Sequence, residues 1–152
     1  DGNILCLYQL VEKHGEILYN TIQEKVDDTR KVFFIHGGVA AEERERIRAI
    51  TEKENNAIII ASYGTFSTGV NIRNLHNLIF ASPSKSRIRN LQSIGRGLRL
   101  GDSKTHAKLY DISDDLIYRD RENYTLKHFQ ERMKIYNEEQ FDYEIHNVDL
   151  KS

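Results

Sequence analysis

Two arginines near the middle of the chain are the residues whose types and spacing most clearly suggest chemistry. Arg96 and Arg99 lie in the segment QSIGRGLR at residues 92–99. On a helix, side chains three residues apart share one face, and each guanidinium can donate paired hydrogen bonds to a phosphoryl group. The segment therefore predicts a phosphate site. Gln92, about a turn earlier, is a candidate to orient the ligand or a water, although an ordinary place on the helix surface stays open for it.

Positive charge is concentrated around this segment. The chain of 152 residues has a net charge of −1, yet residues 55–108 hold eight basic residues and one acidic residue. A block of this kind is expected to face an anion, phosphate first of all, although acidic helices nearby in the fold could equally balance it. Lys85 and Arg87 could neutralise phosphates or merely line a cleft, and neither interpretation is favoured.

Hydroxyl side chains form a second candidate site upstream. Ser62, Thr65 and Thr68 directly follow the apolar run 57–61. Each hydroxyl could donate a hydrogen bond to a phosphate, or could serve only to cap a helix or shape a loop.

The elements that must position these side chains alternate between strands and helices. Short apolar runs predict buried strands, and the amphipathic or charged stretches between them predict helices. The predicted strands are 4–8, 32–35, 57–61, 78–81 and 107–112, and the predicted helices are 10–26, 40–55 and 87–98. This order predicts an α/β domain of three layers, with a mainly parallel sheet flanked by helices. Ligands of such sheets bind beyond the carboxyl ends of the strands, where the loops 62–69 and 82–85 begin.

The last part of the chain differs in character. Residues 124–140 predict a helix with an apolar stripe, and residues 141–150 alternate between apolar and polar side chains like an edge strand. The stripe consists of Leu126, Phe129, Met133 and Tyr136. Because an apolar stripe at this spacing is nearly always a packing surface, we expect the helix to dock onto the sheet.

The order of these segments resembles the second half of superfamily 2 helicases. Residues 92–99 have the pattern Gln-x-x-Gly-Arg-x-x-Arg of their motif VI, and residues 58–72 resemble their motif V. Residues 4–9 stand in the place of motif IV, and His-Gly-Gly at 36–38 before a Glu- and Arg-rich helix is similar to the intervening segment. The resemblance implies a RecA-like motor domain at residues 1–118, with a helix and strand extension at 119–152 packing on it.

The resemblance also implies roles for individual residues. Arg99 would act as an arginine finger and Arg96 would bind the same phosphates of ATP, held with Mg²⁺ mainly by a preceding RecA-like domain of the same polypeptide. Gln92 would position the nucleotide or the attacking water. Gly69 and Asn71 would contact the nucleotide, although Asn71 stands where many members have Asp. The candidates for contacts with the nucleic-acid backbone are Ser62, Thr65, Thr68, Lys85 and Arg87. The loop is one residue longer than its commonest form, so the hydroxyl that makes the contact stays open.

A narrower resemblance is to phage helicases of the T4 type. It is carried by residues 61–69, 74–76 and 85–96 and by the aromatic run in the tail. It implies ATP-driven remodelling of branched DNA and R-loops in repair and recombination, with DNA and RNA–DNA hybrids as candidate substrates. The implied setting is the cytoplasm of a bacterial or phage-infected cell. Two alternatives stay open: the motor half of a duplex translocase of the restriction or remodelling type, and a non-catalytic nucleic-acid-binding module.

Other patterns limit the range of functions. The chain has no Gly-x-x-x-x-Gly-Lys-[Ser/Thr] loop and no Asp-Glu strand end to hold Mg²⁺, so this stretch alone is expected to be inactive. A start at Asp1 rather than Met fits a piece of a longer protein. The single cysteine, Cys6, predicts a buried thiol and excludes an internal disulfide, and the histidines lack ligand spacing, so no metal site is expected. No apolar run approaches the ~20 residues of a membrane span, and no basic-then-apolar stretch suggests secretion.

Overall fold

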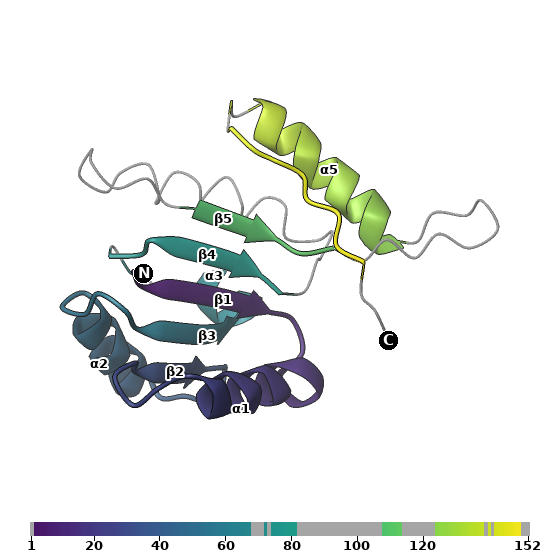
Figure 1. The fold of residues 1–152 in the computed structure, drawn as a ribbon. Coiled ribbons are helices and arrows are strands. Elements are labelled where there is room, and N and C mark those ends of the chain that lie inside the picture. Colours follow the sequence, from purple (N-terminus) through teal and green to yellow (C-terminus); the bar gives the residue numbers. More distant parts are fainter. Residues whose placement is uncertain are drawn as a thin grey trace.

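A five-stranded parallel sheet forms the centre of the computed structural model (Figure 1). The structure describes residues 2–67, 72, 74–81, 108–113, 124–138, 140 and 142–149. The strands are β1 (Ile4–Tyr8), β2 (Val32–Ile35), β3 (Ile58–Ser62), β4 (Asn77–Phe80) and β5 (Lys108–Asp111). Their order in the sheet is β2-β3-β1-β4-β5, and every pairing is parallel. All five carboxyl ends therefore lie along one edge of the sheet, at the arrow tips in Figure 1.

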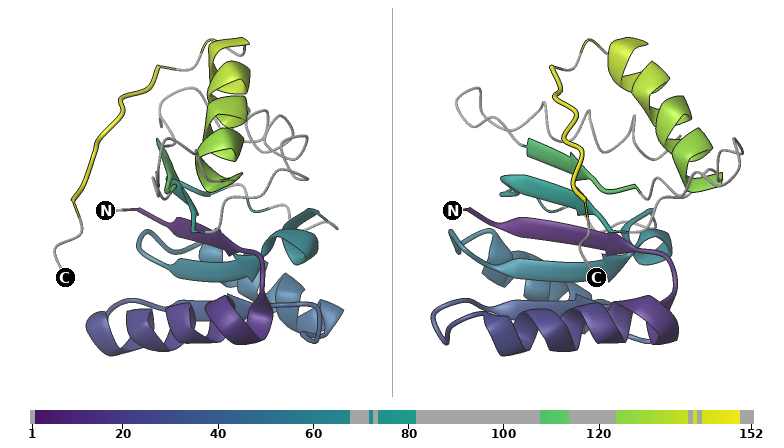
Figure 2. Two further views of the ribbon diagram at one scale, coloured as in Figure 1. Left: turned by 90° about the vertical axis from the view of Figure 1, so that its right-hand side faces the viewer. Right: turned by 45° about the vertical axis from the view of Figure 1, so that its right-hand side comes forward.

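Helices cover both faces of the sheet (Figure 2). They are η1 (Val11–Gly15), α1 (Glu16–Lys25), α2 (Ala41–Thr51), α3 (Tyr63–Ser67) and α5 (Tyr124–Glu138). Helix α1 packs on one face, whereas α2, α3 and α5 contribute Ile47, Tyr63 and Tyr136 to the core of the other. The predicted α/β architecture of three layers is confirmed. None of the described helices is long and apolar enough to cross a membrane.

Alternating side chains of the central strands supply the two cores. On the face of α2, α3 and α5 the fully buried side chains include Leu5, Leu7 and Ile59, and on the face of α1 they include Tyr8 and Ile60. Strands β1 and β3 are buried almost throughout because each has a neighbour on both sides and helices on its faces. Burial of each such apolar side chain contributes about 1.5–3 kcal/mol. The predicted burial of Cys6 is confirmed, since 3% of it is exposed.

The turn from β1 into α1 depends on a close approach between Gly15 and Tyr8. The N–H groups of His14 and Gly15 both donate to the Leu10 carbonyl, at 3.1 and 3.0 Å, which gives the single π-helical turn η1. A Cβ at Gly15 would lie 2.4 Å from Tyr8 Cε2. The Tyr8 hydroxyl in turn donates to the Ile35 carbonyl at 3.3 Å, so β1, η1 and β2 are tied together at the carboxyl edge.

Asn3 organises the opposite edge of the sheet. Its side chain is fully buried and its Nδ2 lies 2.9, 2.8 and 2.8 Å from the carbonyl oxygens of Thr51, Glu54 and Asn74. Its Oδ1 accepts from the Ala57 N–H at 2.9 Å. One amide thus joins the start of β1 to the connections that precede β3 and β4.

Two sequence predictions about local structure are wrong. Residues 63–67, predicted as loop, form the short helix α3 because the Ser62 side chain caps its first turn. The edge strand predicted at 141–150 is not formed in the described residues 142–149, which have no regular secondary structure. Tyr143, Ile145 and Val148 stay exposed there, and Figure 2 shows the segment standing off the sheet. Alternation determines which side chains can face inwards, but a strand also needs hydrogen bonds to a neighbouring backbone. Gln140, with φ of 57°, turns the chain away from the sheet after α5.

The predicted docking of the last helix is confirmed. Tyr136 of α5 is 5% exposed within the core cluster, and Met133 packs against it. The predicted helix at 87–98 lies outside the described residues. The division of the chain at residue 118 stays a prediction.

Candidate nucleotide and nucleic-acid interface

Polar side chains follow several strands along the carboxyl edge of the sheet. Strand β3 ends at Ser62 and β5 ends at Asp111, while His36 directly follows β2. Because the strands are parallel, the loops that leave them begin along the same edge, where ligands of α/β sheets bind. The structure therefore places Ser62 and Thr65, of the predicted site residues, at the edge that the sequence indicated.

The Ser62 and Thr65 hydroxyls bond to each other. Their oxygens are 2.7 Å apart, and the Thr65 N–H donates to Ser62 Oγ at 3.3 Å. Ser62 is 8% exposed and Thr65 is 5% exposed. This arrangement is a helix cap, the alternative interpretation that the sequence left open. Contact of either hydroxyl with a nucleic-acid backbone stays a prediction.

The other predicted site residues lie outside the described residues. They are Thr68, Gly69, Asn71, Lys85, Arg87, Gln92, Arg96 and Arg99. Their roles in binding ATP or nucleic acid stay predictions.

A buried ionic cluster at the end of β5 was missed by the sequence reasoning. Arg132 of α5 donates from Nε to Asp111 Oδ2 at 2.6 Å and from Nη2 to Asp111 Oδ1 at 2.7 Å. The Tyr136 hydroxyl donates to Asp111 Oδ2 at 2.6 Å. The Arg132 and Asp111 side chains are 3% and 8% exposed. A signal was available, because an arginine four residues before Tyr136 on an inward-facing stripe needs a buried counterion.

The electrostatics of this cluster follow from burial and pairing. Burial alone would lower the pKa of Arg132, but the hydrogen bonds and charge of Asp111 raise it overall, with smaller contributions from Tyr136 and Tyr63. Burial raises the pKa of Tyr136, and the charge of Asp111 and its hydrogen bond raise it further. The guanidinium therefore stays charged and the phenol neutral at physiological pH.

The loop after β2 is ordered by its histidine. His36 Nδ1 accepts from the Gly38 N–H at 3.1 Å, and its ring lies 5.1 Å from that of Phe34. A Cβ on Gly37 would meet nothing within 4 Å. The side chain thus serves the turn at the strand end.

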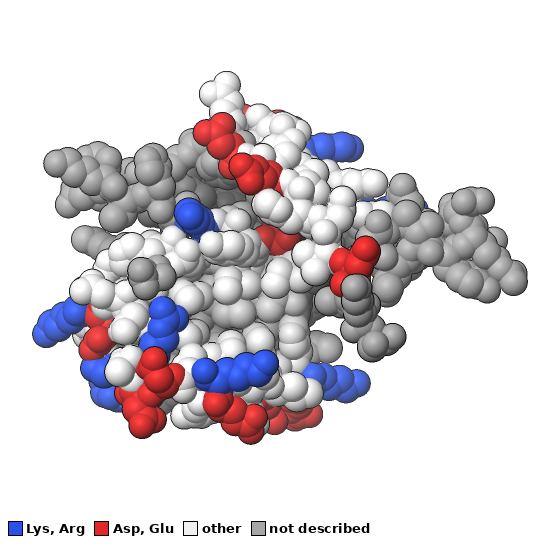
Figure 3. All heavy atoms as spheres, viewed as in Figure 1, with Lys and Arg blue, Asp and Glu red and all other residues white. Residues whose placement is uncertain are grey.

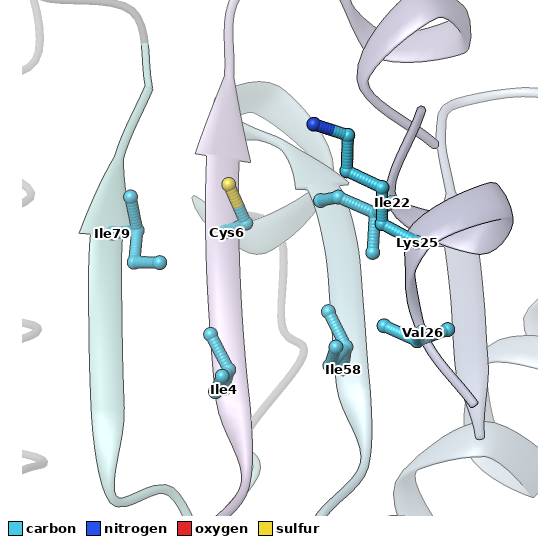
Figure 4. Close-up of a pocket in the computed structure, with 7 residues that line it drawn as sticks. All are labelled: Ile4, Cys6, Ile22, Lys25, Val26, Ile58 and Ile79. Carbon is cyan, nitrogen blue, oxygen red and sulfur yellow. The ribbon is translucent and has the colours of Figure 1, made fainter. Parts of the chain in front are cut away.

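The α1 face of the sheet carries an apolar hollow of about 240 Å³ (Figure 4). Its lining residues are Ile4, Cys6, Ile22, Lys25, Val26, Ile58 and Ile79. Lys25 is the single charged residue of this lining, so the hollow lacks the convergent polar groups of a nucleotide site. Figure 3 shows the molecule from the side of α1, with charged side chains gathered over α1 and α2 and few over the middle of the sheet.

Comparison with known proteins identifies the class of domain. The family model described as the helicase conserved C-terminal domain matches residues 1–101. The chain belongs to this family, and its fold is that of the second RecA-like domain of superfamily 2 helicases. The resemblance indicated by the sequence is confirmed at this level.

Individual helicases are similar to this chain over different shares of its length. The ATP-dependent DNA helicase UvsW of Enterobacteria phage T4 is 35% identical over 160 residues, which cover 99% of this chain and 31% of that protein. The crystal structure of T4 UvsW matches with a TM-score of 0.71 at 36% identity, over 91% of this chain and 29% of that chain. The putative ATP-dependent helicase IRC3 of Saccharomyces cerevisiae is 36% identical over 60 residues, 40% of this chain and 9% of that protein. The chain therefore spans a third or less of the length of these relatives.

A more distant structure shares the fold alone. Domain 2 of the DEAD-box helicase Mss116p, bound to an RNA duplex, has a TM-score of 0.60 at 16% identity, over 75% of this chain and 43% of that chain.

Proposed function

We propose that this chain is the second motor domain of an ATP-dependent DNA helicase that remodels branched DNA or R-loops. The observation that carries the proposal is the 35% identity with the phage T4 ATP-dependent DNA helicase over 99% of the chain. ATP with Mg²⁺ would be held mainly by a preceding RecA-like domain of the same polypeptide. The likeness to a phage protein supports the cytoplasm of an infected bacterial cell as the setting.

Arg99 and Arg96 complete the ATP site from this domain. Their guanidinium groups bind the γ-phosphate and stabilise the charge that develops on it during transfer, and an arginine finger of this kind accelerates turnover about 10³–10⁵-fold. Gln92 positions the nucleotide or the attacking water, and Gly69 and Asn71 contact the nucleotide. Closure of the two domains on ATP and their opening after hydrolysis provide the movement.

The loop after β3 couples that movement to nucleic acid. Ser62, Thr65 or Thr68 contacts the phosphate backbone, and Lys85 and Arg87 neutralise it. Ser62 and Thr65 lie at the carboxyl edge of β3, where a ligand of the sheet is expected, which supports this assignment. Recognition through phosphates is insensitive to base sequence and weakens steeply as the salt concentration rises.

The decisive experiment is DNA-stimulated ATP turnover of the full-length protein and its Arg99→Ala variant. We expect Arg99→Ala to lose about two or more orders of magnitude in turnover with DNA binding intact. The control is Arg46→Ala, because Arg46 pairs with Glu43 on the exposed side of α2 and is 57% exposed. Equal turnover in Arg99→Ala would move the finger role to Arg96. Absence of turnover in the wild-type protein would favour a non-catalytic binding module.

A duplex translocase of the restriction or remodelling type is the second candidate. It would use the same ATP site but move along duplex DNA without separating the strands. Strand-displacement and translocation assays on the full-length protein distinguish the two.

A further inference from the structure

The buried cluster of Asp111, Arg132 and Tyr136 lies where α5 meets the carboxyl edge of the sheet. Both carboxylate oxygens of Asp111 are bonded by Arg132, and one of them also accepts from the Tyr136 hydroxyl. The Arg132 guanidinium additionally lies over the Phe129 ring, 5.9 Å from its centre. Asp111 of β5 and the Phe129 ring thus hold the Arg132 guanidinium at the end of β5, and Tyr136 holds Asp111.

Stability alone is a poor explanation for this cluster. Removing two charges from water costs as much as their attraction returns, so apolar side chains of similar size often stabilise such a position equally well. Arg132 Nη1 is also buried and has no hydrogen-bond acceptor among the residues that the structure describes, which adds a further cost. The two parallel hydrogen bonds to Asp111 instead fix the position and orientation of the Arg132 guanidinium, because a bidentate pair leaves it little freedom to rotate.

Tyr63 links the cluster to the Ser62–Thr65 turn. It is the first residue of α3, lies between the two hydroxyl residues in sequence, and is 6% exposed. Its ring lies 5.9 Å from that of Phe80, and it belongs to the same core cluster as Tyr136. Phe80 in turn is the register partner of Asp111, the residue that pairs with Arg132. A shift of Arg132 would therefore reach the turn through Phe80 and the buried Tyr63 side chain.

We propose that Arg132 is a positioning residue, which through Tyr63 holds the Ser62–Thr65 turn in the geometry that contacts the nucleic-acid backbone. The inference rests on the proposed function, because it assigns the turn to nucleic-acid contact. Arg132 itself touches neither ATP nor nucleic acid. Its removal acts on the affinity for nucleic acid rather than on the chemical step.

The test measures ATP turnover of the full-length protein against the concentration of single-stranded DNA. In Arg132→Met we expect the DNA concentration for half-maximal stimulation to rise about fivefold or more, with turnover at saturating DNA and the KM for ATP within about twofold of wild type. Arg46→Ala serves as the matched arginine control and leaves all three quantities unchanged. In a Ser62→Ala background, Arg132→Met adds little further, because both changes act on one turn.

The outcomes separate this inference from the proposed function. If Arg132→Met lowers only the Tm and leaves the DNA concentration for half-maximal stimulation unchanged, the positioning role is overturned and the helicase proposal stands. Absence of DNA-stimulated turnover in the wild-type protein would overturn both. If Arg132→Met does not fold, Arg132→Lys decides, because it keeps the charge beside Asp111 but loses the two-donor fork. If folded Arg132→Lys needs the same DNA concentration for half-maximal stimulation as the wild type, the positioning role is equally refuted.

Discussion

Replacement of Asn3 by alanine is expected to destabilise the domain strongly, although Asn3 lies at the edge of the sheet opposite the candidate site. The substitution removes every side-chain bond at a fully buried position. It leaves the buried Ala57 N–H without its acceptor and the Asn74 carbonyl without its donor. The Thr51 and Glu54 carbonyls keep other donors, the Glu54 N–H at 3.1 Å and Asn74 Nδ2 at 2.9 Å.

The magnitude follows from those two orphaned groups. Each buried polar group left without a partner costs about 1–3 kcal/mol, so the two groups together should lower the free energy of unfolding of Asn3→Ala by about 2–6 kcal/mol. A domain of this size is stable by about 5–15 kcal/mol, so the loss is a large fraction of the total.

Urea denaturation followed by circular dichroism measures this free energy. Asn20→Ala is the matched control, because Asn20 is exposed on α1 and its substitution should change stability by less than about 0.5 kcal/mol. If Asn3→Ala costs no more than Asn20→Ala, water replaces the lost bonds and the reasoning about Asn3 is refuted.

Three further predictions concern other buried contacts. Gly15→Ala places a Cβ 2.4 Å from the buried Tyr8 ring and should cost about 1–3 kcal/mol; an unchanged Tm would contradict the close approach. Burial raises the pKa of the Cys6 thiol from 9.0 to about 12. The thiol of the unfolded chain therefore ionises at a lower pH than the thiol of the folded chain. Between pH 9 and 12 the contribution of Cys6 to the free energy of unfolding should fall by about 1.4 kcal/mol per pH unit. The stability advantage over Cys6→Ala should shrink across that range, and a constant difference would show that the folded thiol titrates normally. Tyr136→Phe removes one bond to a buried carboxylate and should cost about 1.5–3 kcal/mol in urea denaturation; a cost near zero would mean that the hydroxyl is dispensable to the cluster.

The sheet was predictable because its signals are local. Apolar runs such as 4–8 and 32–35 coincide with β1 and β2, and the alternation of strands and helices gave the parallel arrangement. The short helix α3 was missed because its cap depends on the rotamer of Ser62, which composition does not specify. The tail was misjudged because pairing depends on a partner strand and not on the pattern of the segment itself.

The candidate site, too, could be predicted from the sequence only in part. The place of Ser62 and Thr65 at the carboxyl edge followed from the order of elements, since parallel strands end together. Their mutual hydrogen bond did not follow, because two hydroxyls can face each other or a ligand with equal ease. The hydrogen-bond partners of the Asn3 and Arg132 side chains lie 21 to 71 residues away, so only the folded chain brings them together.

The position of β1 in the sheet has a mechanical consequence. The first strand of the chain is the central one, bonded to β3 on one side and β4 on the other. A force applied at residue 2 along the strand would act on both ladders in shear, so that many hydrogen bonds must fail together instead of one after another. Tension from the proposed preceding RecA-like domain would thus enter this domain at its most resistant point.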